Sequence, residues 1–85
     1  MNQTKVLELV KDLIRQNEAE RVYPSYTTLL VVLREARSRF EDYNGDDLKQ
    51  LLRKMIKEKK LFAGNTVNDV WISNKKDNYY EHPRN

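Results

Sequence analysis

Between residues 46 and 60 the apolar residues recur with the period of an α-helix, and this repeat constrains the fold more than any other feature. The apolar positions share one arc of a helical wheel: Leu48, Leu51, Leu52, Met55 and Ile56. The opposite side carries a basic row, flanked by Gln50 and Lys54: Lys49, Arg53, Lys57 and Lys60. The spacing therefore predicts a helix from Asp46 to Lys60 that buries one face and exposes a cationic one.

Two further segments carry the same period and supply surfaces against which this helix can pack. The first is predicted to run from Thr4 to Glu18, with this apolar arc: Val6, Leu7, Leu9, Val10, Leu13 and Ile14. The second is predicted to run from Tyr26 to Phe40, with this apolar arc: Tyr26, Leu29, Leu30, Val32, Leu33, Ala36 and Phe40. Val31 falls outside that arc, beside Thr27, and is expected to be a lone exposed valine or part of a small dimer patch.

The segments between these helices contain turn-forming residues. Pro24 disfavours helical backbone before it, so an extended link or short strand is expected at Val22–Tyr23, with Ser25 as the N-cap of the second helix. In the loop of residues 41–47, Asp46 is expected to cap the third helix. This loop holds four carboxylates, but its glycine lies at the wrong position for an EF-hand, so calcium binding is not expected.

After the third helix, short apolar runs replace the helical period and predict two strands joined by a turn. The strands are expected at Leu61–Ala63 and Val70–Ile72. Gly64-Asn65 and Asn68-Asp69 are both turn signals, and the tip of the turn is expected at Thr66–Asp69. Because an isolated two-stranded hairpin is marginally stable in water, it needs the helical core as a support. Leu61, Phe62, Trp71 and Ile72 are expected to cover the end of that core, with Phe62 and Trp71 holding the hairpin to it. The predicted fold class is mainly α, with three helices and a small β-hairpin.

The length and composition indicate one domain. The 85 residues are predicted to form a domain over residues 1–75, followed by a polar, flexible tail at 76–85. The longest uninterrupted apolar run, Leu29–Leu33, is far shorter than a membrane-spanning helix. The sequence has no cysteine, which suits a reducing cytosol, so we expect a cytoplasmic protein without membrane contact.

The residue types do not assemble a motif for catalysis. The single histidine, His82, lies in the polar tail beside Pro83, and the sequence has no metal-spaced cluster and no glycine-rich phosphate loop. We therefore expect no enzymatic activity, no metal, no cofactor and no small-molecule substrate.

The positive charge of the chain is concentrated on the third helix. The net charge is +3, and the segment from Lys49 to Lys60 holds six basic residues and one acidic residue. The rest of the chain holds ten basic and twelve acidic residues. Like charges four residues apart weaken an isolated helix by about a few tenths of a kcal/mol, so helix stability does not explain this choice. Solubility or an anionic partner does.

Three helices, an extended link after the first and a hairpin after the third resemble the winged helix-turn-helix superfamily. The resemblance is most specific over Leu48–Ile72, within the segment DLKQLLRKMIKEKKLFAGNTVNDVWI. It implies a winged-helix domain that binds double-stranded DNA, as a transcriptional regulator or an accessory factor. The implied contacts on the third helix are Lys49, Gln50, Arg53, Lys54, Lys57 and Lys60. The implied backbone contacts in the wing are Asn65, Thr66 and Asn68.

A second interpretation is a winged-helix module for protein–protein interaction, or a homodimer, without nucleic-acid binding. It is favoured by Asp46 and Asp47, since many helix-turn-helix proteins place their base contacts at the start of the recognition helix. It is also favoured by a wing tip without Lys or Arg. The two interpretations are compatible, because many helix-turn-helix proteins bind DNA as dimers.

Overall fold

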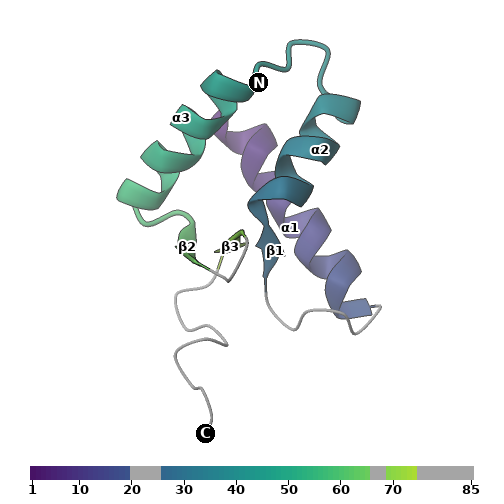
Figure 1. Ribbon diagram of the computed structural model, residues 1–85, viewed down its shortest axis with the longest axis vertical. Coiled ribbons are helices and arrows are strands. Elements are labelled where there is room, and N and C mark those ends of the chain that lie inside the picture. Colours follow the sequence, from purple (N-terminus) through teal and green to yellow (C-terminus); the bar gives the residue numbers. More distant parts are fainter. Residues whose placement is uncertain (20–25, 66–68, 75–85) are drawn as a thin grey trace, which may run out of the picture.

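The computed structural model describes residues 1–19, 26–65 and 69–74, which form three helices and a small sheet (Figure 1). The elements in chain order are α1 (Gln3–Ala19), β1 (Thr27–Thr28), α2 (Leu29–Arg39), α3 (Gly45–Lys57), β2 (Phe62–Asn65) and β3 (Val70–Ser73). The predicted fold class is confirmed: mainly α with a small β-hairpin, in a three-helix winged arrangement. The expected link at Val22–Tyr23, the Ser25 cap and the tail at 76–85 lie outside the described residues.

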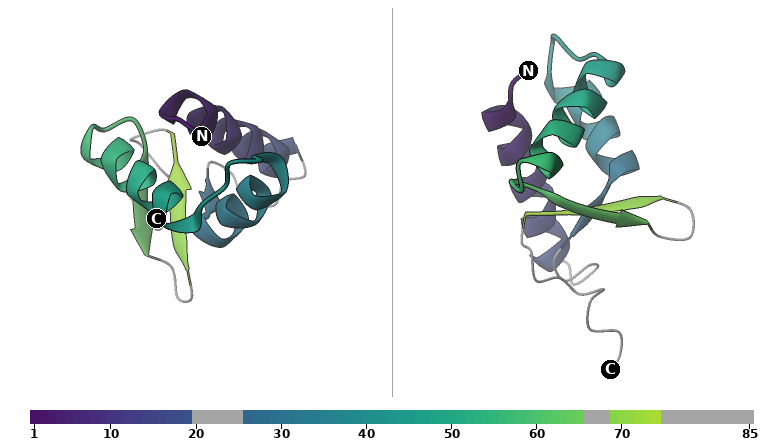
Figure 2. Two further views of the ribbon diagram at one scale, coloured as in Figure 1. Left: turned by 90° about the horizontal axis from the view of Figure 1, so that it is seen from above. Right: turned by 90° about the vertical axis from the view of Figure 1, so that its left-hand side faces the viewer.

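The sheet lies across one end of α2 and α3 and alongside α1 (Figure 2). Buried residues from all three helices and from the sheet region meet in one core: Val6, Leu9, Val10, Leu13, Ile14, Val32, Ala36, Leu48, Leu52, Met55, Leu61 and Ile72. The buried faces of α1 and α3 are those that the apolar spacing predicts. The hydrophobic effect, which favours removing these apolar side chains from water, is the main force that holds the helices together.

The sheet has three antiparallel strands in the order β1-β3-β2, so β3 is central. Ile72 of β3 pairs with Thr27 on one side and with Ala63 on the other. The prediction that the second helix begins at Tyr26 is therefore wrong. Thr27 and Thr28 form β1, and α2 begins at Leu29 with the Thr28 hydroxyl accepting a 3.4 Å hydrogen bond from Val31 N.

The two faces of the sheet have different surroundings because side chains alternate along a strand. Ile72 and its partner Thr27 are on the face toward the helices and are almost fully buried. Trp71 is buried on the opposite face, where it lies against its cross-strand partner Gly64. Of the four residues predicted to cover the core, Leu61 and Ile72 do so, whereas Trp71 is buried on the other face and the half-buried Phe62 lies outside the core cluster.

The exposed and buried sides of α2 also differ from the prediction. Leu30 was expected in the core, yet it is 64% exposed. Val31 and Thr27 were expected at the surface, yet Val31 packs against the core and Thr27 is fully buried. For Thr27 the cause is β1, since its pairing with β3 fixes Thr27 beneath the helices and takes residues 27 and 28 out of the predicted helix.

The two ends of α3 differ from the prediction by one to three residues. At the start, Asn44 and not Asp46 is the N-cap, and its side-chain oxygen accepts a 3.1 Å hydrogen bond from Asp47 N. At the end, the helix stops at Lys57, and Lys59 adopts the left-handed backbone conformation with φ 63°.

A Schellman motif closes the end of α3. Lys59 N donates to Ile56 O at 3.0 Å, and Lys60 N donates to Met55 O at 2.8 Å. This reversal turns the chain toward the sheet, so that Leu61 enters the core fully buried. The position in the left-handed conformation is usually glycine, because a side chain there is strained.

We predict that Gly64→Ala destabilises the protein by about 1–3 kcal/mol, the usual cost of overpacking. A Cβ at residue 64 would lie 2.5 Å from Trp71 Nε1, so the buried indole would have to move. Urea unfolding followed by tryptophan fluorescence measures the change. Gly45→Ala is the control, because its Cβ would meet only the end of the Tyr43 side chain at 3.1 Å. Equal stability of both variants would contradict this packing.

We predict that Lys59→Gly stabilises the protein by about 1 kcal/mol, since glycine adopts the left-handed conformation without strain. Lys54→Gly removes the same charge from the helix interior and should instead destabilise by about 1 kcal/mol. The free energies of unfolding of both variants, measured in urea, should therefore move in opposite directions. A loss of stability in Lys59→Gly would argue against the Schellman motif.

Candidate nucleic-acid interface

The outer face of α3 is the most cationic surface that the structure describes on a single helix. Its inner face is buried through Leu48, Leu52 and Met55. The outward side chains are all exposed: Lys49, Gln50, Arg53, Lys54 and Lys57. Five of the six residues predicted on this face therefore lie on α3 and point away from the core, as the helical period requires.

The four cations of this face have no acidic partner among the described residues, as is also true of Lys11 on α1 and Arg37 on α2. Within the described residues, Lys49, Arg53, Lys54 and Lys57 make no ion pair. By contrast, the arginines of α1 and α2 that flank Asp12 and Glu35 are paired with these carboxylates: Arg15, Arg34 and Arg39. The positive charge on α3 is therefore available to an anionic partner.

Lys60, the sixth predicted residue, does not belong to this face. Since α3 ends at Lys57, Lys60 follows the Schellman reversal and is not on the helix. Its Nζ donates a 2.8 Å hydrogen bond to Gln3 Oε1 and lies 3.4 Å from Glu58 Oε1. Lys60 thus ties the end of α3 to the start of α1.

The first turn of α3 is acidic. Asp46 and Asp47 are exposed there, where they interact favourably with the positive end of the helix dipole. The cationic face consequently begins one turn into the helix, at Lys49, and continues to its last turn. An anionic partner would avoid the first turn and contact the middle and the end of α3.

Of the predicted wing contacts, one lies within the described residues. Asn65 is exposed at the end of β2, where it pairs with Val70 of β3. Thr66 and Asn68 lie outside the described residues.

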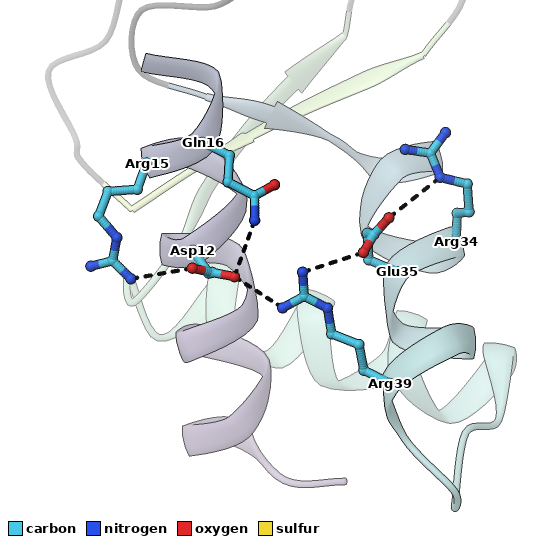
Figure 3. A network of polar contacts seen from close by, with 6 residues as sticks. All are labelled: Asp12, Arg15, Gln16, Arg34, Glu35 and Arg39. Carbon is cyan, nitrogen blue, oxygen red and sulfur yellow. Dashed lines mark hydrogen bonds and ion pairs between the residues drawn. The ribbon is translucent and has the colours of Figure 1, made fainter. Parts of the chain in front are cut away.

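A second polar cluster joins α1 to α2 (Figure 3). Arg39 Nη1 donates to Asp12 Oδ2 at 3.0 Å, and Arg39 Nη2 lies 3.3 Å from Glu35 Oε1. Arg15 and Gln16 approach the same Asp12 carboxylate at 3.4 and 3.5 Å. The Glu35–Arg39 pair has the spacing of helix neighbours and is visible in the sequence, whereas the Asp12–Arg39 contact depends on the fold.

This cluster shifts the pKa values of Asp12 and Arg39 in the directions that favour their charged forms. The hydrogen bond from Arg39 holds the pKa of Asp12 below the usual range of an aspartate, and Arg15 acts in the same direction. The hydrogen bond to Asp12 raises the pKa of Arg39. Because both groups are exposed at the surface, we assign the cluster to the alignment of α1 with α2.

Within the described residues, no group of three or more histidine, cysteine or acidic side chains is placed to hold a metal ion. None of the described helices is long and apolar enough to cross a membrane. Comparison of the chain with protein-family models, with curated proteins and with solved structures found no match.

We predict that Arg39→Gln raises the pKa of Asp12 toward the usual range, because it removes the largest cause of the shift. A carboxyl with a lowered folded-state pKa stabilises the protein at neutral pH, and this contribution is lost as the pH falls through that pKa. Acidification should therefore cost the variant less stability than the wild type. Carboxyl NMR titration and urea unfolding between about pH 2 and pH 6 measure both effects.

Arg34→Gln serves as the control, since Arg34 contacts Glu35 and not Asp12. It should leave the Asp12 pKa in place. An Asp12 pKa that is equally low in Arg39→Gln would contradict the assigned cause.

Proposed function

We propose that this protein binds double-stranded DNA through the cationic outer face of α3, as a transcriptional regulator or an accessory factor. The observation that carries the proposal is the set of four exposed cations on α3 that lack acidic partners among the described residues: Lys49, Arg53, Lys54 and Lys57. The proposal includes no catalytic step and no cofactor, and it is consistent with the cytoplasmic location expected from the sequence.

The dimensions of α3 fit such a role. From Lys49 to Lys57 the helix rises about 12 Å, and a helix fits the major groove of B-DNA, which is about 12 Å wide. The guanidinium of Arg53 can donate two hydrogen bonds to guanine, and the amide of Gln50 can pair with adenine. The flexible lysines instead suit the phosphates. The acidic first turn would then point away from the nearest phosphates.

The three-helix winged arrangement supports the proposal by leaving the outer face of α3 open to a large partner. The hairpin of β2 and β3 follows α3 directly, so Asn65 at the end of β2 could hydrogen-bond to a DNA backbone without adding charge.

A second candidate function is a protein-interaction module or homodimer that does not bind DNA. The specific observation in its favour is Leu30, which is 64% exposed on the first turn of α2. It is the large apolar side chain that the described part of the chain leaves in water, although scattered exposed residues of this kind are common.

We predict that the affinity for a random-sequence duplex falls steeply with salt. Release of counterions by four cations gives a slope of log K against log salt of about −3.6. Arg53→Glu with Lys57→Glu should weaken binding at least tenfold and bring the slope close to about −2. Fluorescence anisotropy between about 50 and 200 mM salt measures both quantities.

The control for this experiment is Lys5→Glu with Lys11→Glu, which makes the same charge change on exposed positions of α1. Its slope should stay near that of the wild type. An affinity that does not change with salt concentration would refute an interface on α3. So would an equal loss of affinity in the two double variants.

A further inference from the structure

A small apolar groove lies between the start of α2, one edge of α3 and β3. Its volume is about 230 Å³, and its lining is formed by Leu29, Lys49, Leu52, Arg53, Ile56, Val70 and Ile72. Leu52 and Ile72 are buried, whereas Leu29, Ile56 and Val70 are half-buried. Lys49 and Arg53 are the exposed members of the lining. The groove therefore combines an apolar interior with two cations at its opening.

The volume indicates what kind of group fits. Pockets for cofactors and drug-sized ligands usually measure about 300–1,000 Å³, and this groove is smaller. One branched or aromatic side chain would fill it. A single apolar side chain held in a groove is how many proteins recognise an anchor residue of a peptide segment.

The charges at the opening indicate what flanks that anchor. Lys49 and Arg53 form no ion pair with a described residue, so they attract carboxylates that arrive with the anchor.

We propose that the groove binds an acidic segment of a partner protein, with one leucine- or phenylalanine-sized side chain inserted between α2, α3 and β3. Carboxylates next to the anchor would pair with Lys49 and Arg53.

This inference does not depend on DNA binding, although the two partners would compete. Both use Lys49 and Arg53, whereas Lys54 and Lys57 do not line the groove. The two pairs lie on the same helix and carry the same charge. Substitution of one pair at a time therefore distinguishes binding in the groove from general electrostatic attraction to α3.

The test uses the full chain, labelled with ¹⁵N, and a capped peptide in which one phenylalanine stands between two glutamates on each side. We expect saturable amide shifts centred on Leu29, Ile56 and Val70. The same peptide with alanine as anchor, or with lysines in place of the glutamates, should bind at least tenfold more weakly. These peptide controls require no change to the protein.

The matched variants are two pairs of exposed lysine and arginine positions. Lys49→Glu with Arg53→Glu should weaken binding of the peptide at least tenfold. Lys54→Glu with Lys57→Glu should weaken it less than about threefold, because charges outside the groove act through screening solvent. Circular dichroism melts verify that both variants are folded. Duplex binding should fall in both pairs, so the failure of one proposal is distinguishable from failure of the other.

Several outcomes would overturn the inference. Equal binding of the phenylalanine and alanine peptides would show that no anchor enters the groove, and equal loss in both double variants would show charge attraction alone. If duplex DNA but not the peptide shifts the groove amides, the groove belongs to the DNA interface. If these amides shift with protein concentration alone, the occupant is a second copy of the chain.

Discussion

The pairing of β3 with a strand on each side is the interaction on which the rest of the structure depends. Ile72 is the point where this pairing meets the core, since it lies opposite one residue of each neighbouring strand and is buried beneath the helices. β1 leads directly into α2, and β2 follows the reversal after α3. The central strand therefore fixes the start of one helix and the end of another, and through them the orientation of the cationic face.

Local patterns predicted those parts of the structure that local forces determine. The helical period of α3 identified its buried face through Leu48, Leu52 and Met55, because one apolar arc must leave water wherever the helix packs. β1 was missed for the opposite reason. Two threonines have no strand preference strong enough to interrupt a helical period, and they form a strand because β3 offers them a partner more than forty residues later. The unexpected burial of Thr27 follows from that pairing.

The candidate site was predictable to a similar extent. Lys49, Arg53 and Lys57 are exposed on α3 because their spacing alone places them opposite the apolar arc. Lys60 was wrongly expected on the helix, which ends at Lys57. The reversal at Lys59 was not predicted, because the left-handed conformation is usually signalled by glycine and not by lysine. The groove beside the cations could not be found in the sequence, since its walls come from three elements that only the folded chain brings together.

The charges of α3 and of the α1–α2 junction are balanced in different ways. Asp12 and Arg39 neutralise each other across two helices, whereas Lys49, Arg53 and Lys57 repel one another along α3 and form no ion pair with a described residue. That repulsion costs about a few tenths of a kcal/mol for each pair, a small amount beside the burial of Leu48, Leu52 and Met55. The core can therefore hold α3 in place with its charges unbalanced. An anionic partner would remove this repulsion on binding, so the same arrangement that slightly weakens the free protein would strengthen the complex.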